Sequence, residues 1–208
     1  MPDRTARPEK INLAGHARDR SGLLSWITGS LALAGLSILT AQVFTTEDGV
    51  AADLFEVEGA WERVVPDRRW REFRGMLRRA VDGSISLENR VDEKRRWYPA
   101  PKVPVPVTVA VDNAVSDFAT VIEVGASDRL GLLYDITRTF AELGLDVHLA
   151  KVATYEGRVV DAFYVRDGVG RKLADDPEEI DRALRRRLES SPDARRDVSR
   201  AVAPKRSV

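Results

Sequence analysis

The chain has 208 residues, enough for two domains of roughly 100 residues that each bury a core. Its 33 Lys and Arg balance its 33 Asp and Glu, so no net charge attracts a nucleic acid or a membrane surface, and we predict neither as a partner. Cysteine is absent, which excludes disulfides and thiolate metal ligands. This composition fits a reducing cytoplasm, where we expect the protein.

No targeting or membrane segment is predicted. Residues 1–10 carry charges, and no apolar core follows them within the length of a signal peptide. Residues 22–40 are rich in apolar side chains, but Gly29, Ser30 and Gly35 interrupt them. We interpret this stretch as a helix, a tight turn and a strand, not as a membrane span.

The sequence contains an internal duplication. Residues 19–28 read D-R-S-G-L-L-S-W-I-T and residues 128–137 read D-R-L-G-L-L-Y-D-I-T, so they share D-R, G-L-L and I-T at one constant offset. The similarity continues from residues 31–38 to 140–147 and, after a one-residue slip, from 53–57 to 161–165. Because this period exceeds that of solenoid repeats, we infer a duplicated domain.

The first copy predicts a strand, a helix, two strands and a second helix. Their expected ranges are 10–17, 22–35, 37–46, 50–57 and a helix opening at 66–67. The Asp48-Gly49 pair predicts the hairpin turn. Four prolines near the end of 88–106 favour an extended linker and disfavour a helix there. Residues 107–111 (VTVAV) are expected to be the last strand of this first unit.

The second copy repeats the pattern. A strand begins at Ala119, an apolar helical stripe from Leu132 ends at Gly144, and strands over 146–155 and 159–165 form a hairpin. A final helix follows Pro177. We predict an α+β protein with two ferredoxin-like (βαββαβ) domains. They span residues 10–113, with an inserted linker over 88–106, and 118–190, followed by a tail over 191–208.

The D-R-x-G turn joins a strand to a helix N-terminus in each unit. Free N–H groups and the helix dipole favour a carboxylate there, glycine permits close approach, and the aspartate can accept from an ammonium group. Such a site suits a free amino acid. The alternative is that Asp19 and Asp128 only cap their helices.

These motifs resemble the ACT domain, a small-molecule-binding regulatory module. The second unit, with T-V-I-E-V-G-A-S-D-R-L-G-L-L-Y-D-I-T and R-V-V-D-A-F-Y-V, is more closely similar to the C-terminal ACT pair of the bifunctional PII uridylyltransferase/uridylyl-removing enzymes. The resemblance implies a glutamine sensor in nitrogen regulation. It also implies two partners, a catalytic nucleotidyltransferase/hydrolase region and the PII protein.

The resemblance implies that ligand binds at the two turns and at the start of a strand. The matching positions are Asp19, Gly22, Leu23, Leu24, Asp128, Gly131, Leu132, Leu133 and Asp146. The family usually has proline before the glycine of the turn, whereas Ser21 and Leu130 stand there in this chain. The turns are therefore less pre-set than in the family.

The family's catalytic motifs are not found. Neither Gly-Ser pair is followed by paired aspartates, and neither His16 nor His148 is followed by aspartate. We therefore predict no enzymatic activity, no metal site and no cofactor. The alternative to a sensor is an ACT scaffold without ligand, used for dimerisation or for docking to a catalytic partner.

Overall fold

The computed structural model describes residues 9–18, 20–46, 48–62, 64–98, 105–155, 158–173 and 177–190. Asp19, the hairpin turn at 156–157 and the predicted tail over 191–208 lie outside these ranges. The strands are β1 (Ile11–Arg18), β2 (Leu36–Thr45), β3 (Val50–Gly59), β4 (Thr108–Asp112), β5 (Thr120–Ser127), β6 (Asp146–Lys151), β7 (Thr154–Tyr155) and β8 (Arg158–Arg166). The helices are α1 (Leu23–Ala34), α2 (Asp67–Val81), α3 (Leu87–Arg95), α4 (Leu132–Glu142) and α5 (Pro177–Glu189).

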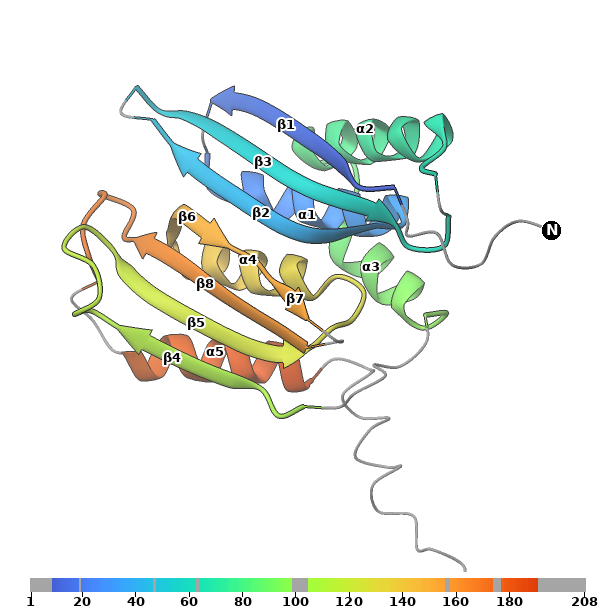
Figure 1. The fold of residues 1–208 in the computed structure, drawn as a ribbon. Coiled ribbons are helices and arrows are strands. Elements are labelled where there is room, and N and C mark those ends of the chain that lie inside the picture. The colour runs from blue at the N-terminus through green and yellow to red at the C-terminus, as the bar shows by residue number, and fades with distance from the viewer. Residues whose placement is uncertain are drawn as a thin grey trace, which may run out of the picture.

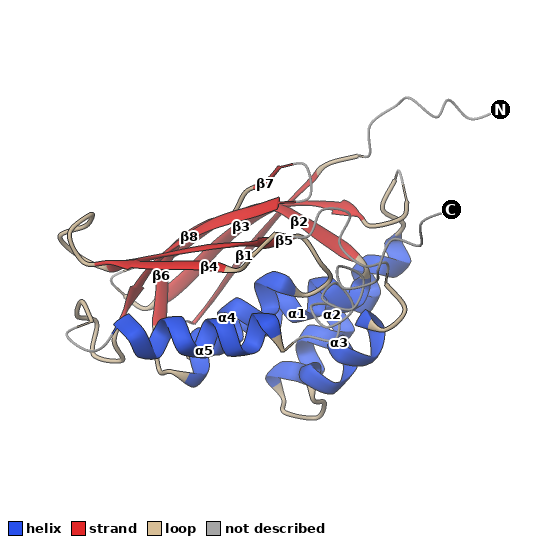
Figure 2. Ribbon diagram, turned by 90° about the horizontal axis from the view of Figure 1, so that it is seen from below, coloured by secondary structure: helices blue, strands red, loops and turns tan. Residues whose placement is uncertain are grey.

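Both units contribute to one 8-stranded antiparallel sheet in the order β1-β3-β2-β6-β8-β5-β4, with β7 paired to β8. The helices lie together on one face of this sheet, as Figure 1 and Figure 2 show. The α+β class and the two ferredoxin-like units are confirmed. The arrangement follows from the sequence, because alternating apolar residues give each strand one face to bury against amphipathic helices.

The helix and hairpin of the first unit form as predicted. Helix α1 runs from the residue after Gly22 to the residue before Gly35, and Gly35 adopts a left-handed φ of 72°. This conformation is available to glycine without a Cβ clash, so the chain leaves the helix there and enters β2. Phe55 and Val57 of β3 point into the core and are almost fully buried.

A pseudo-two-fold axis relates the two units. Strands β2 and β6 pair antiparallel, with Gln42 opposite Lys151. Beneath them, Thr28 of α1 and Thr137 of α4 face each other, and their hydroxyl oxygens are 3.1 Å apart. In both pairs the partners are equivalent residues of the duplication, separated by its offset of 109 positions. The axis therefore passes between Gln42 and Lys151 and between Thr28 and Thr137.

One core extends across the axis. It joins apolar residues of both units, including Leu31 and Phe55 from the first and Phe140 and Phe163 from the second. The rings of Phe140 and Phe163 meet edge to face with centroids 5.1 Å apart. The two units therefore share one hydrophobic core and pack as a single body.

The prediction that residues 88–106 are an extended linker without a helix was wrong for its first part. Helix α3 spans Leu87–Arg95, and the Ser86 side chain accepts a hydrogen bond from the Asn89 N–H. The prolines begin only at Pro99, so they restrict the chain after the helix and not within it. A serine cap followed by nine residues without Gly or Pro is sufficient to start α3.

The expected last strand of the first unit belongs to the other unit's part of the sheet. Strand β4 pairs antiparallel with β5, with Val109 opposite Val124. It thus lies beside the first strand of the second unit, and β1 of the first unit has no equivalent neighbour within the described residues. The prediction assigned residues 107–111 to the first unit because they follow it in the sequence. The first strand of either unit, β1 or β5, has an edge with which these residues could pair.

Gly29 provides a test of the helix contact between the units. A Cβ built on Gly29 lies 2.7 Å from the Tyr134 ring, whereas one built on Gly75 of α2 meets nothing within 4 Å. We expect Gly29→Ala to lower the free energy of unfolding by about 1–3 kcal/mol through overpacking. Gly75→Ala, the matched control, should raise it by about 0.5–1 kcal/mol through helix propensity. Urea unfolding followed by circular dichroism measures both, and equal effects would contradict close packing of α1 on α4.

Candidate functional site

The two D-R-x-G turns have the same backbone. Gly22 and Gly131 each precede a helix with left-handed φ values of 87° and 72°. The Leu23 N–H donates to the Arg20 carbonyl at 3.0 Å, and the equivalent Leu132 N–H donates to the Arg129 carbonyl at 3.2 Å. The duplication has therefore produced two helix N-termini of the same geometry.

The capping explanation does not account for Asp128. The residue at the N-cap position is glycine in both helices and has no side chain that could accept a capping hydrogen bond. Asp128 lies three residues before Gly131 and is exposed. Among the described residues, no side chain accepts a hydrogen bond from the first N–H groups of α1 or α4, as an anion-binding helix terminus requires.

A cavity opens at the first turn, between the two units. We call it the first-turn cavity. Its walls come from the turn, the start of α1, the end of β2, the start of β3, the second half of α4 and the start of β6. Its lining residues are Arg20, Ser21, Gly22, Leu23, Leu24, Ser25, Val43, Thr45, Ala51, Asp53, Thr137, Ala141, Leu145, Asp146 and Val147. Its volume of about 30 Å³ holds little more than a water molecule, so a larger ligand requires the turn and β6 to separate.

Three charged side chains line the first-turn cavity. Arg20 supplies a cation, and its guanidinium carbon lies 4.7 Å from the centre of the Trp26 ring. Asp53 and Asp146 supply carboxylates, and Asp53 is only 6% exposed. Together with the uncapped N-terminus of α1, the cavity offers groups for both a carboxylate and an ammonium ion.

Sequence reasoning missed Arg20 and Asp53 as site residues. Asp53 shares one face of β3 with Phe55 and Val57, and the structure buries all three. The signal was an ionisable residue at the apolar-facing positions of β3, repeated in the second unit as Asp161. A charge on the buried face of a strand is costly unless it has a partner or a ligand.

The second turn is closed by α3. A Cβ on Gly131 would lie 2.7 Å from the Val91 side chain and 3.1 Å from the Arg95 guanidinium. Arg95, only 2% exposed, donates to the Leu130 carbonyl at 3.1 Å and to the Asp135 carboxylate at 2.9 Å. Helix α3 therefore packs directly against Gly131 of the second turn.

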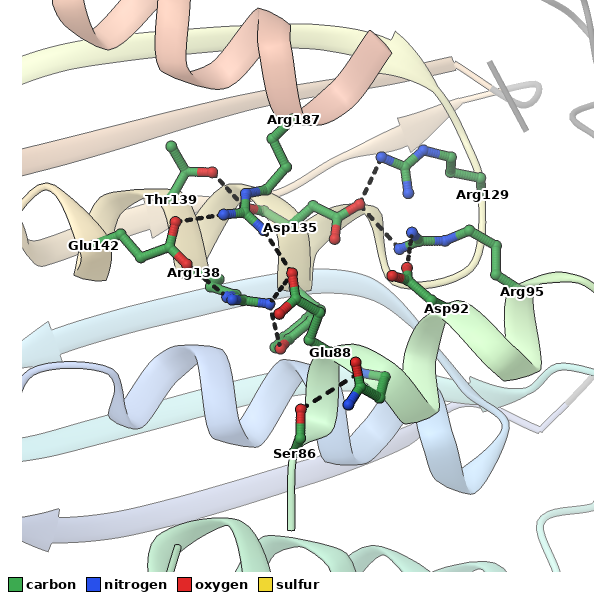
Figure 3. A network of polar contacts seen from close by, with 12 residues as sticks. Ser86, Glu88, Asp92, Arg95, Arg129, Asp135, Arg138, Thr139, Glu142 and Arg187 are labelled. Carbon is green, nitrogen blue, oxygen red and sulfur yellow. Dashed lines mark hydrogen bonds and ion pairs between the residues drawn. The ribbon is translucent and has the colours of Figure 1, made fainter. Parts of the chain in front are cut away.

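The Arg95 contacts belong to a buried network, drawn in Figure 3. Arg129 of the second turn pairs with the same Asp135 oxygen at 2.6 Å, so two guanidinium groups share one carboxylate. Asp92 pairs with the other side of Arg95 at 2.8 Å. Buried charges persist when several partners satisfy them, so this arrangement fixes α3 against α4.

A second network ties the start of α3 to α4 and α5 (Figure 3). Glu88 lies 2.7 Å from Arg138 and 3.6 Å from Arg187, and Arg138 also pairs with Glu142 at 2.8 Å. The hydrogen bond from Arg138 lowers the pKa of Glu88. Helix α3 is thereby held at both of its ends.

Asp161 lies beside the closed second turn and is 1% exposed. Burial raises its pKa to about 7; a hydrogen bond from the Ala153 N–H opposes this effect, and the charge of Asp128 adds to it. Its Oδ1 accepts from Ala153 at 3.2 Å. Two carboxyl groups thus meet at the second turn.

Another cavity, of about 330 Å³, lies on the helix side of the first turn, between α1, α3 and α4. It shares Ser21, Gly22, Ser25 and Ala141 with the first-turn cavity. The charged residues along it, Glu88, Arg138 and Glu142, already pair with one another. We therefore interpret this larger cavity as lying against the outer side of the first turn.

The residues proposed for the site from sequence thus fall into two groups. Gly22, Leu23, Leu24 and Asp146 line one cavity, although Asp146 comes from the other unit. Asp128, Gly131, Leu132 and Leu133 lie at the second turn and line neither cavity. Asp19 lies outside the described residues.

Within the described ranges, no cluster of three or more His, Asp or Glu side chains could hold a metal ion. In that same part of the chain, none of the helices combines the length and apolar character needed to cross a membrane.

Comparison with known proteins supports the resemblance. Residues 108–193 match a family model described as ACR9-like, ACT-like domain. The matched range begins at the first residue of β4, in agreement with the pairing of that strand to the second unit.

Several curated relatives carry the name bifunctional uridylyltransferase/uridylyl-removing enzyme. The protein from Rhodospirillum rubrum is 37% identical over 158 residues, which are 74% of this chain and 17% of that protein. Those from Gluconobacter oxydans (35% over 161 residues) and Azospirillum brasilense (37% over 164 residues) each cover 76% of this chain and 17% of their own length.

Among solved structures, an aspartate kinase from Synechocystis has a TM-score of 0.18 and 11% identity, covering 96% of this chain and 41% of that chain. This likeness supports no inference. The curated matches show that the chain is homologous to an ACT region of the uridylyltransferases, and it spans about 17% of their length.

The closed second turn predicts unequal effects of alanine at the two glycines. Gly22→Ala should cost about 1–2 kcal/mol of unfolding free energy, because its positive φ is strained while its nearest neighbour lies 3.7 Å away. Gly131→Ala should cost about 1–3 kcal/mol more, because the new methyl group meets Val91. Urea unfolding of the two variants measures the difference, and equal losses would show that α3 does not press on the turn.

Asp161 predicts a pH dependence of stability. Its pKa is about 7 in the folded chain and about 3.9 when unfolded, so the native state binds the extra proton between these values. Its stabilising contribution is full below about pH 4 and is lost as the pH rises through 7. Asp161→Asn should therefore gain stability over the parent as pH rises from 4 to 8, by about 2–4 kcal/mol. Urea titrations at several pH values measure this, with the exposed Asp117→Asn as control; parallel curves for parent and Asp161→Asn would contradict it.

Proposed function

We propose that this pair of ACT-like units binds a free α-amino acid in the first-turn cavity and acts as a regulatory module. The observation that carries the proposal is the meeting of the first turn with Asp53 and Asp146, which come from different units. A ligand held there contacts both halves of the duplication. Its binding energy can therefore change how the halves pack.

The charges fit the two ends of an amino acid. The uncapped N-terminus of α1 and the Arg20 guanidinium suit an α-carboxylate. The Asp53 and Asp146 carboxylates suit an α-ammonium group, and the burial of Asp53 strengthens that attraction. A ligand with only one of these charges gains only one of the two attractions.

The same charges favour glutamine over glutamate. Arg20 and the helix terminus are engaged by the α-carboxylate in this arrangement. A second carboxylate on the ligand would then face Asp53 and Asp146, whereas a carboxamide adds no charge. Glutamine is also the ligand that the resemblance implies.

The output of the module is proposed from its relatives. Their names join a uridylyltransferase and a uridylyl-removing activity, and this chain corresponds to 17% of their length. We propose that the amino acid shifts a catalytic region of that kind between its two activities, with the PII protein as the further partner. The module itself supplies binding and no chemistry.

A second function is favoured by the closed second turn. Because Val91 and Arg95 fill the space beside Gly131, the second unit offers a fixed surface in place of a ligand site. In this candidate the second unit is a scaffold that docks a catalytic partner. The two functions are compatible, one in each unit.

Calorimetric titration of the purified chain with glutamine tests the sensor. We expect saturable heat with one site per chain, and at least ten-fold weaker binding of glutamate. Asp53→Asn and Asp146→Asn should each weaken glutamine at least ten-fold, since each removes one of the carboxylates proposed for the ammonium group. The exposed Asp117→Asn is the control and should not change the affinity. No heat with any amino acid would overturn the sensor for this chain.

A second pair of variants tests separately how the first and the second turn contribute to glutamine binding. Asp19→Ala should weaken glutamine binding, whereas Asp128→Ala should leave both affinity and stoichiometry unchanged because the second turn is closed. A loss of binding in both, with the fold intact by circular dichroism, would show that the second turn also takes part. No loss in either would favour the scaffold function.

A further inference from the structure

The outer edge of β1 is unusual for a strand of eight residues. Within the described ranges β1 pairs only with β3, through all residues from Ile11 to Arg18, so its other side carries backbone groups without a strand partner. Long, exposed strand edges readily accept another extended chain. Strand β1 forms one end of the sheet in Figure 1.

The duplicate shows how the equivalent edge is covered. Strand β5, the counterpart of β1, has β4 at that position as an antiparallel neighbour. The side chains of β4 alternate between half-buried and exposed, with Val109 and Val111 packed against the core. Helix α5 supports it, because Arg185 donates to the Val107 carbonyl at 2.8 Å. The occupant of such an edge is thus an extended segment with apolar residues at every second position.

In the first unit the corresponding helix is α2. Phe73 and Ala80 of α2 are buried, as Ile180, Leu184 and Leu188 of α5 are, but Trp70 and Leu77 of α2 pack on the core and remain only half-buried. At helical spacing, Trp70, Arg74 and Leu77 lie on one side of α2. Apolar surface thus remains beside an edge that lacks a strand.

The charge of this helix differs from that of its counterpart. Helix α2 contains six arginines and two acidic residues, a net charge of +4, whereas α5 contains four of each and is neutral. Arg71, Arg74 and Arg78 are exposed, and in the described part of the chain they form no ion pair. This charge is available to a partner.

We propose that the outer edge of β1 is a docking site for an extended acidic segment of a partner polypeptide, which adds a strand antiparallel to β1. Backbone hydrogen bonds to β1 supply affinity, and alternate apolar side chains cover Trp70 and Leu77. The arginines of α2 select acidic over basic segments. This inference does not depend on amino-acid binding at the first turn.

A second copy of the chain does not fit this edge as well. Pairing β1 with β1 of another molecule would bring two α2 helices together, each with a net charge of +4. Repulsion between these two positively charged helices opposes association of the two molecules. The partner is therefore a different, acidic segment.

A peptide derived from β4 provides the probe. The sequence of residues 105–113 is V-P-V-T-V-A-V-D-N, and its acidic form carries Thr108→Glu and Ala110→Glu. The basic control carries Thr108→Lys and Ala110→Lys. We expect the acidic peptide to bind the full chain at least ten-fold more tightly than the basic one, as measured by fluorescence anisotropy. Hydrogen exchange should then show new protection of β1 amides.

Charge reversal on the helices separates this surface from general electrostatics. Arg74→Glu with Arg78→Glu on α2 should weaken the acidic peptide at least ten-fold. The matched pair Arg182→Glu with Arg186→Glu, at the same spacing on α5, should not. Both variants are first shown to keep the parent unfolding curve; if either does not, Arg→Gln at the same positions replaces it.

Three results would overturn the proposal. These are protection of β5 and not of β1, equal effects of the two charge reversals, and a free chain whose β1 amides are already protected by self-association or by residues 1–8. Sedimentation of the chain without peptide, and exchange in a chain that lacks residues 1–8, decide the last of these.

Discussion

The contact on the pseudo-two-fold axis is the interaction on which the rest of the molecule depends. Strands β2 and β6 pair over three residue pairs, and helices α1 and α4 pack against each other beneath them. There the buried hydroxyls of Thr28 and Thr137 lie 3.1 Å apart, and each is also within hydrogen-bond distance of a carbonyl in its own helix, Leu24 at 2.9 Å and Leu133 at 2.8 Å. Each hydroxyl has one proton, so when one donates across the axis the other donates to its own helix. This contact merges two small sheets and cores into one, which buries more apolar surface than either unit could alone. It also brings Asp146 to the first turn.

Helix α3 breaks the symmetry that the duplication creates. It lies under the contact and reaches both units, since Lys94 donates to the Leu33 carbonyl of α1 at 2.6 Å while Arg95 donates to the second turn. The two turns therefore share one backbone conformation but differ in their surroundings. The first turn borders a cavity, whereas Val91 and Arg95 of α3 pack against the second turn. The ability of a D-R-x-G turn to bind is decided by what covers it and not by the turn itself.

Local patterns predicted most of the fold. The glycines at 22, 35 and 131, the hairpin at Asp48-Gly49 and the apolar stripes each act over a few residues, so their sequence is sufficient. The partner of β4 and the presence of α3 were missed for different reasons. Two equivalent strand edges compete for β4, and four prolines after α3 masked a short helix that tertiary ion pairs stabilise. For the site, the repeat located the turns. It could not show that Asp53 joins the first turn or that Val91 covers the second.

The asymmetry has a mechanical consequence. The first-turn cavity is too narrow for an amino acid at rest, so a ligand must separate the first turn from the start of β6. The second turn cannot yield in the same way, because Arg95, Arg129 and Asp135 tie α3 to α4 in a buried network. A ligand at the proposed first-turn site would therefore act on one side of the axis, where the two units meet through three strand pairs. For the proposed regulatory module, binding at only one of the two turns would favour one packing of the units over another.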